Sequence, residues 1–210
     1  MNKNLTLLQE LLSQADFDVW HPYEPKFVGP ETRTVALFNE VNSDTALALI
    51  TQLKHLAEMA PEEPITLLLN TEGGSLTDAL AIYDCISQLC CPVVCLTTGL
   101  CASAGLLILA SCDYRVATPN TTFFYHEPIC STQVLLSEEQ LNGISKHYLF
   151  SKEVSDKLLR KRAGMKVKDW NKNFKNKTNF YFTADEAKSY NFIDALTVTD
   201  KIEFEIDEDY

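Results

Sequence analysis

No stretch of this sequence is both apolar and long enough to cross a membrane, since a spanning helix needs about 18 consecutive apolar residues. The apolar run near the N-terminus is short and is broken by Gln9 and Glu10, so it does not resemble a signal peptide. The seven cysteines form no paired Cys-x-x-Cys pattern of a structural metal site. Cys85, Cys95 and Cys101 lie within apolar segments. This location is typical of reduced thiols, which pack as small apolar groups in a protein core. We therefore expect a cytoplasmic protein without a cysteine metal site.

Positive charge is also scarce. The 18 Lys and Arg residues stand against 29 Asp and Glu residues, which gives a formal net charge of −11. Recognition of nucleic acid needs a basic face that displaces counterions, so this balance argues against a nucleic-acid partner. Five of the acidic residues fall in residues 203–209 (EFEIDED), which we expect to be a solvated end. The length predicts an N-terminal arm over residues 1–30, one domain over 31–200 and an acidic tail over 201–210.

Segments typical of strands and helices alternate along the domain. Apolar runs predict strands at residues 34–38, 64–70, 92–97, 114–117 and 122–125. Helical spacing and capping residues predict helices at residues 44–60, from 75 onwards, 103–111 and 137–163, with a last short helix opened by 183–186. Alternation of this kind implies right-handed crossovers, so the predicted fold class is α/β with a mostly parallel sheet.

The predicted helix over residues 137–163 is unusually long. Ser137 and Gln140 match a capping box at its start, and Gly164 suits a left-handed cap at its end. Its apolar residues recur as one stripe: Leu141, Ile144, Tyr148, Val154 and Leu158. Because the helix comes late and is charged elsewhere, we expect it to project and pack against another copy of the chain. Packing only against its own core is the alternative.

Three elements could carry chemistry. Ser103 lies between an apolar strand and an apolar helix, where it could be a nucleophile beside backbone N–H groups or only a helix cap. Gly73 and Gly74 allow a strand-to-helix turn to present an N–H group to a ligand, although such glycines also occur in plain tight turns. His126 follows a strand and precedes Glu127 and Pro128, so we place it at the edge of the sheet where sites gather.

These elements occur in an order and spacing that resemble the Clp proteolytic subunit (ClpP) family of self-compartmentalising serine peptidases. The resemblance covers about residues 60–200. Residues 70–75 (NTEGGS) are similar to the family turn Asn-Ser-Pro-Gly-Gly-Ser, and residues 99–105 (GLCASAG) are similar to Gly-Gln-Ala-Ala-Ser-Met-Gly around the nucleophile. The remaining matches are 81–84 (AIYD), Pro119-Asn120 followed by 125–128 (YHEP) against Ile-His-Gln-Pro, and 182–194 (FTADEAKSYNFID). Five motifs in order are far more specific than any one of them.

The resemblance implies a ClpP/crotonase-like fold of repeated ββα units with residues 137–163 as a protruding handle helix. It implies Ser103 as the nucleophile and His126 as the general base. Backbone N–H groups of Gly74 and Ala104 would form the oxyanion hole. The third catalytic position aligns with Asn179, where the family has Asp. No metal or organic cofactor is implied.

The same resemblance implies a homo-oligomer of stacked heptameric rings that encloses the sites and cleaves peptides or unfolded proteins. An AAA+ unfoldase is a possible feeding partner, although residues 1–30 do not match the segment through which the family meets its ATPase. The chain also departs from the family at Ala104, where the family has Met, and at residues 129–134 (ICSTQV), which lack the glycines of the family's cleft strand.

Two other functions stay open. Residues 112–123 (CDYRVATPNTTF) also resemble a strand of the crotonase superfamily of acyl-CoA enzymes, which lacks a Ser-His pair. A ClpP-like ring or scaffold subunit without activity is the second alternative, and Asn179 favours it because an amide gives no negative charge to an imidazolium. The pair of Ser103 and His126 favours the peptidase.

Overall fold

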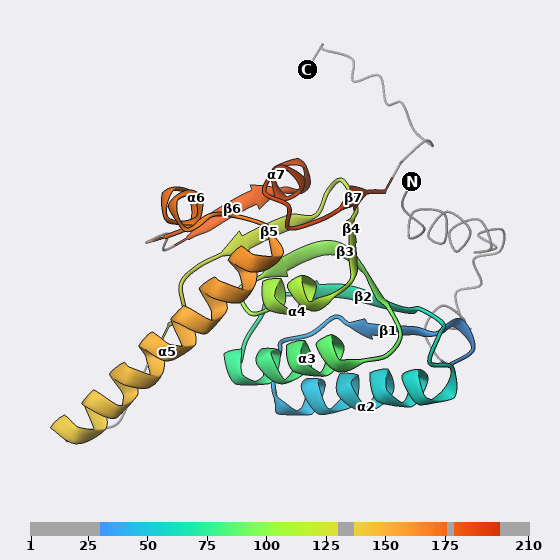
Figure 1. Ribbon diagram of the computed structural model, residues 1–210, viewed down its shortest axis with the longest axis horizontal. Helices are drawn as coiled ribbons and strands as arrows, with labels where there is room; N and C mark the ends of the chain where they lie inside the picture. The colour runs from blue at the N-terminus through green and yellow to red at the C-terminus, as the bar shows by residue number, and fades with distance from the viewer. Residues whose placement is uncertain (1–29, 130–136, 176–178, 198–210) are drawn as a thin grey trace, which may run out of the picture.

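Seven strands form one sheet in the computed structural model, which describes residues 30–129, 137–175 and 179–197 (Figure 1). The strands are β1 (Thr34–Leu37), β2 (Ile65–Thr71), β3 (Val93–Ala102), β4 (Tyr114–Ala117), β5 (Thr122–Tyr125), β6 (Phe180–Thr183) and β7 (Ala195–Leu196). After a short 3-10 turn, η1 (Pro30–Thr32), the helices are α2 (Ser43–Met59), α3 (Leu76–Gln88), α4 (Gly105–Ser111), α5 (Glu138–Arg162), α6 (Val167–Asn173) and α7 (Ala184–Ser189). The predicted arm before Pro30 and the predicted tail at 201–210 lie outside the described residues, so those domain boundaries stay predictions.

The sheet is mostly parallel, as the alternation of strands and helices predicts. Strands β1, β2, β3, β4 and β7 lie side by side in that order and run parallel. Strand β2 is a continuous apolar run whose residues are alternately buried and half-buried, because both of its faces are covered. Strand β5 pairs in parallel with the end of β3, and β6 runs antiparallel to β5. The predicted α/β class is confirmed.

Strand β3 changes partners along its length, from β4 to β5, before it reaches Ser103. Its first half pairs with β4, from Val94 to Thr97, and its last three residues pair with β5. Between the two halves Gly99 has φ +70°, and the Asn70 side chain accepts a hydrogen bond from the Leu100 N–H at 3.1 Å. The strand therefore bends at Gly99 instead of ending there.

The predictions for residues 92–111 need two corrections. The strand runs on to Ala102, so residues 99–102 are strand, and the turn before α4 is limited to Ser103 and Ala104. Helix α4 begins at Gly105 and not at position 103; its N-cap is Ala104, and no side chain caps it. Ser103 therefore does not act as the helix cap. Pairing of Leu100, Cys101 and Ala102 with β5 continues the strand past Gly99, which outweighs the local tendency to turn.

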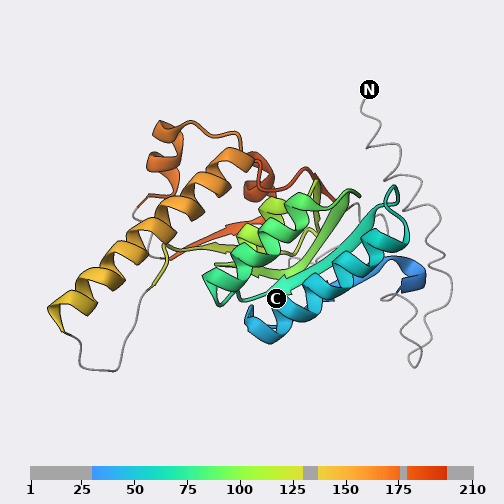
Figure 2. The same ribbon diagram turned by 60° about the horizontal axis from the view of Figure 1, so that its bottom comes forward.

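Helices α2, α3 and α4 pack beside one another along one side of the sheet (Figure 2). Asn42 caps α2 in a capping box with Thr45, and Ser75 caps α3 by accepting a hydrogen bond from the Asp78 N–H. Helix α7 packs against β5, β6 and β7, and the predicted capping box of Thr183 and Glu186 opens it. These caps fix where the helices begin and so place the turns between strand and helix.

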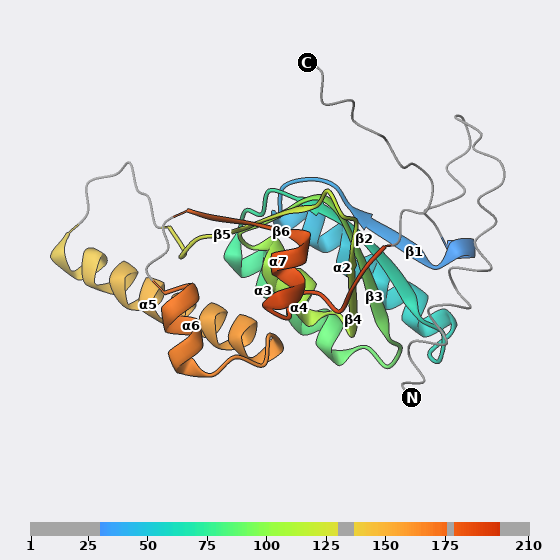
Figure 3. The same ribbon diagram turned by 90° about the horizontal axis from the view of Figure 1, so that it is seen from above.

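Helix α5 extends from the body of the molecule in every view (Figures 1 and 3). The capping box of Ser137 and Gln140 is present at its start. At its end Gly164 has φ +65°, and the Met165 N–H donates to the Arg160 carbonyl, as expected of a left-handed glycine cap. The side chains buried in this helix are Ser151, Ser155 and Leu159. The residues of the predicted apolar stripe are half-buried or exposed, and their packing against another copy of the chain stays a prediction.

Three short elements near the C-terminus were not predicted from the sequence. Helix α6 has seven residues and no side-chain cap, so its local signals are weak. It is held by burial of Trp170 and by Phe174, which directly follows it and packs on aromatic rings of β5 and β6. Strands β6 and β7 have four and two residues, too few for a periodicity to show.

Candidate active site

Ser103 lies in a strained turn between β3 and α4. Its φ is +53°, a value that few non-glycine residues adopt and that costs about 1–2 kcal/mol. The turn is held by two hydrogen bonds: the Ser103 N–H donates to the Phe124 carbonyl at 2.8 Å, and the Leu106 N–H donates to the Ser103 carbonyl at 3.0 Å. The half-buried side chain lines a cavity of about 1040 Å³. Strain of this kind lifts a side chain out of the strand and exposes it at the start of the helix.

The glycine turn after β2 packs directly on the Ser103 turn. A Cβ atom on Gly73 would lie 2.6 Å from the Ala102 carbonyl oxygen and 2.8 Å from the Ser103 Cβ, so only glycine fits there. The chain on its other side is fixed by Val41, whose N–H donates to the Gly73 carbonyl and whose carbonyl accepts from the Ser75 N–H, both at 2.7 Å. These contacts fix the position of the glycine turn relative to the Ser103 turn.

Two backbone donors in this region have no partner. Among the described residues, neither the Gly74 N–H nor the Ala104 N–H donates a hydrogen bond, and both residues line the same cavity as Ser103. An unpaired N–H group beside a cavity is suited to bind negative charge on a ligand. The site thus brings the Ser103 hydroxyl and two backbone N–H groups without a partner among the described residues to one cavity.

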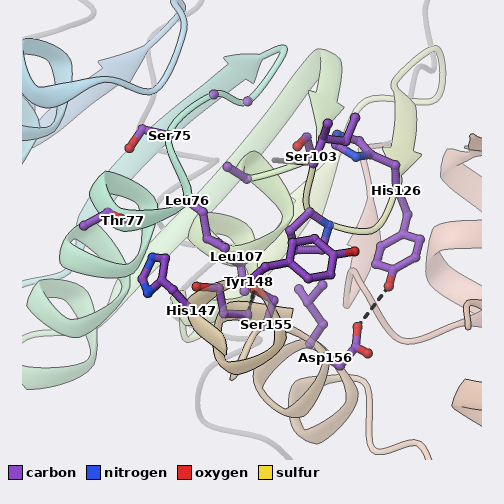
Figure 4. A pocket seen from close by; sticks show the side chains of 18 of the residues that line it. Ser75, Leu76, Thr77, Ser103, Leu107, His126, His147, Tyr148, Ser155 and Asp156 are labelled. Atoms are coloured by element: carbon purple, nitrogen blue, oxygen red, sulfur yellow. Dashed lines mark hydrogen bonds between the residues drawn. The ribbon is translucent and has the colours of Figure 1, made fainter. Parts of the chain in front are cut away.

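His126 lies one residue beyond the end of β5 and also lines the cavity, on the same side as Ser103 (Figure 4). Its ring packs against Phe124, with centroids 5.3 Å apart, and its Nδ1 lies 2.6 Å from the Glu127 carbonyl oxygen. When Nδ1 carries the proton it donates to that carbonyl, and Nε2 is then free to accept a proton. No hydrogen bond between described residues joins His126 to Ser103.

Asn179 lies next to this site but outside the cavity. The last pair of the β5–β6 ladder is Tyr125 with Phe180, so the following position brings Asn179 opposite His126. Asn179 is exposed, and within the described part of the chain it forms no hydrogen bond with His126. The structure therefore brings Ser103, His126, Gly74 and Ala104 to one cavity and leaves Asn179 at its border.

Helix α5 contributes residues that the sequence analysis did not assign to the site. Tyr148, Ser151, Ser155 and Asp156 line the cavity, and Figure 4 shows the hydrogen bond that Asp156 accepts. The donor is the buried Tyr125 hydroxyl, 2.9 Å from Asp156 Oδ1. The i, i+4 spacing of Lys152 and Asp156 indicates that the two side chains lie on one face of the helix. The sequence does not indicate that Tyr125 is the partner of Asp156.

Lys152 joins the same helix to the loop that carries His126. Its Nζ lies 2.6 Å from Glu127 Oε1 and 3.3 Å from Asp156 Oδ2. Burial alone would lower the pKa of Lys152, but the hydrogen bond to Glu127 and the charge of Asp156 outweigh it and raise the pKa above its ordinary value. Burial and the Asp156 carboxylate likewise raise the pKa of Tyr125. Lys152 therefore stays charged and Tyr125 stays neutral at physiological pH.

Competing chemistries have little support in the described residues. Cys101, two positions before Ser103, is fully buried, and burial raises the pKa of its thiol well above the ordinary value, so it is no nucleophile. No group of three or more His, Cys, Asp or Glu residues in residues 30–129, 137–175 and 179–197 is placed to hold a metal ion. No helix in these ranges is long and apolar enough to span a membrane.

A comparison with protein families gives a match over most of the chain. The sequence model of a protein family described as Clp protease matches residues 30–200 of this chain. The match includes the glycine turn, the Ser103 turn, His126 and Asn179.

Proposed function

This chain belongs to the Clp protease family, and on that premise we propose that it is a serine endopeptidase that cleaves peptide bonds through an acyl-enzyme on Ser103. The observation that carries the proposal is the cavity where Ser103 and His126 meet the unpaired N–H groups of Gly74 and Ala104. A nucleophile, a base and two oxyanion donors are the groups that acyl transfer needs.

In the proposed mechanism His126 Nε2 takes the proton from the Ser103 hydroxyl as the oxygen attacks the substrate carbonyl carbon. The carbonyl oxygen becomes negative and accepts hydrogen bonds from Gly74 and Ala104, donors of a kind that contribute about 3–4 kcal/mol each. His126 then gives its proton to the leaving amine as the C–N bond breaks. Water, activated by the same imidazole, attacks the acyl-Ser103 ester and releases the carboxylic acid.

For the third catalytic position we propose Asn179. Its place opposite His126 lets its amide oxygen accept a hydrogen bond from Nδ1–H, as the Asn of Cys-His-Asn peptidases does. An amide supplies no negative charge to an imidazolium, so we expect Asn179→Ala to lower activity much less than His126→Ala. The Glu127 carbonyl already occupies Nδ1 in this structure, which gives a physical reason for the small effect.

We further propose that copies of this chain assemble into stacked heptameric rings through the projecting part of α5. Leu141, Leu149 and Phe150 there are each at least half exposed, which is unfavourable for apolar side chains unless another surface covers them. Rings joined in this way would enclose the sites, so that only peptides or unfolded chains reach Ser103. An AAA+ unfoldase that delivers such chains remains part of the proposal.

A fluorophosphonate probe tests the catalytic assignment. We expect the probe to label the wild-type protein and to label neither Ser103→Ala nor His126→Ala. Ser189→Ala is the control and should be labelled fully, since Ser189 is an exposed serine of α7 that does not line the cavity. Absence of labelling in intact oligomers would instead identify an inactive ring subunit. Saturable binding of a coenzyme A thioester without labelling would identify the crotonase-type alternative.

A further inference from the structure

His126 lies outside the strand ladder, so something other than β5 must hold its ring. The ladder between β5 and β6 ends at Tyr125, and the next residues, 126–129, belong to no helix or strand. A general base acts efficiently only when its ring is held within about 0.5 Å of its productive position relative to the nucleophile. The position of the His126 ring therefore depends on the contacts of the two residues that flank it.

Both flanking residues are bonded to one turn of α5. Tyr125, on one side, donates its hydroxyl to Asp156 at 2.9 Å and packs edge-on against Trp170 and Phe174. Glu127, on the other side, binds Lys152 at 2.6 Å. Lys152 and Asp156 are themselves an i, i+4 pair with atoms 3.3 Å apart. The histidine is thus spanned by a closed polar network that begins and ends on the same helix.

Glu127 also touches the ring itself. Its carbonyl oxygen lies 2.6 Å from His126 Nδ1 while its carboxylate is bound by Lys152, so the ion pair limits how far this carbonyl can move. The Lys152, Glu127 and Asp156 side chains are each about one-fifth exposed, which weakens screening of their charges by solvent. Their formal charges add to one negative charge, and two of them are bonded to or carried by the sequence neighbours of a base that must become positive. Asn179 supplies no such charge.

We propose that Lys152 is a positioning residue for the reaction: through Glu127 it fixes the carbonyl that orients the His126 ring. Asp156 secures the other side of the histidine through Tyr125, and the two carboxylates supply the negative charge that an Asn at the third position cannot. Lys152 does not act as a general base, because it keeps its proton. This inference rests on the proposed function of Ser103 and His126.

The test compares Lys152→Met with Lys152→Arg and with Lys157→Met, an exposed lysine on the same helix. We expect Lys152→Met to lower kcat for a peptide substrate and the rate of fluorophosphonate labelling about tenfold, with little change in KM, because a charge-assisted hydrogen bond is lost. Lys152→Arg should restore most of the rate, and Lys157→Met should match the wild type.

A spectroscopic readout separates positioning from mere stability. The sequence has four histidines, so ¹⁵N NMR of histidine-labelled protein can follow the ring, with His126→Gln to assign its signals. We expect the Nδ1 and Nε2 shifts of His126 to change in Lys152→Met and to return in Lys152→Arg. Should Lys152→Met not fold, Glu127→Gln gives the same comparison, because it keeps the volume of the side chain and removes the ion pair.

Two results would overturn the inference. One is wild-type labelling and kcat in the folded variant; the other is a lower rate with unchanged ring shifts, which would make Lys152 a purely structural residue. A wild-type protein that the probe does not label would refute the proposed function instead. In that case the ring shifts in the variants still decide whether Lys152 positions His126.

Discussion

An alanine at position 73 would place its Cβ atom inside the turn that carries Ser103. The three nearest atoms are the Ala102 carbonyl oxygen at 2.6 Å, the Ser103 Cβ at 2.8 Å and the Ala104 nitrogen at 2.9 Å. Two of these are backbone atoms, so no rotation of a side chain can relieve the contact. The turn itself would have to move away from β2.

The size of the effect follows from these distances. Ordinary contact begins near 3.4 Å, so the Ala102 oxygen would have to move by about 0.8 Å. Overpacking of this kind costs about 1–3 kcal/mol, and a non-glycine residue at the φ of +92° observed for Gly73 costs about 1–2 kcal/mol more. We expect Gly73→Ala to lower the free energy of unfolding by roughly 2–5 kcal/mol. A displacement near 1 Å at the nucleophile should lower its reactivity about 100-fold.

The assay measures two quantities on each variant, urea unfolding and the rate of fluorophosphonate labelling. Gly164→Ala is the matched control, because Gly164 also has a positive φ, +65°, but a Cβ there meets no atom within 4 Å. We expect that control to lose about 1–2 kcal/mol of stability and to label at the wild-type rate. Labelling of folded Gly73→Ala at the wild-type rate would refute the reasoning, since the Ser103 turn would then not depend on close approach of the glycine turn.

Three further changes test other parts of the structure. Ser103→Gly should be more stable than Ser103→Ala by about 1 kcal/mol in thermal or urea unfolding, because glycine relieves the positive φ; equal stability would mean that the turn is not strained. Asp194→Asn should lower the free energy of unfolding by about 3 kcal/mol at pH 7, since it leaves the buried Arg115 guanidinium without its carboxylate. Burial alone would raise the pKa of Asp194, but its bonds to Arg115 outweigh this and lower it. That stability is therefore present above the unfolded pKa of about 3.9 and is lost as pH falls through the lower folded value, so the variant should show a flatter stability profile below pH 4. Phe174→Ala should cost about 3–5 kcal/mol in urea unfolding, because this fully buried ring joins α6 to the aromatic cluster of β5 and β6; a loss below 1 kcal/mol would contradict that role.

Most of the regular structure could be predicted because its signals are local. Ser75, Ser137 and Thr183 each precede a helix where a capping residue predicts one, and β2 follows an apolar run. The signals fail where strand pairing or ring packing decides, as in the extension of β3 along β5 or in α6 around Trp170. Strand β5 and Tyr125, whose ring packs edge-on against Trp170, both lie far along the sequence from the segments they stabilise, so propensity alone cannot find them.

In the candidate site, too, short segments could be predicted from the sequence, whereas contacts between residues distant in the sequence could not. The motifs around Ser103, His126 and the glycine turn could be found because each is a short segment whose backbone shape demands particular residues. Asn179 was found as a departure from a motif, which suggested a loss of charge at the site. In the structure Lys152, on a helix that follows in the sequence, contacts the carboxylates of Glu127, which follows the same histidine, and of Asp156, which accepts from the Tyr125 hydroxyl before it. Glu127 stands where the family motif has Gln and Tyr125 where it has Ile, so this network is a feature of this chain and not of the motif. A substitution that removes charge at one position can therefore be offset by neighbours in space, and a site must be compared as a set of contacts and not one position at a time.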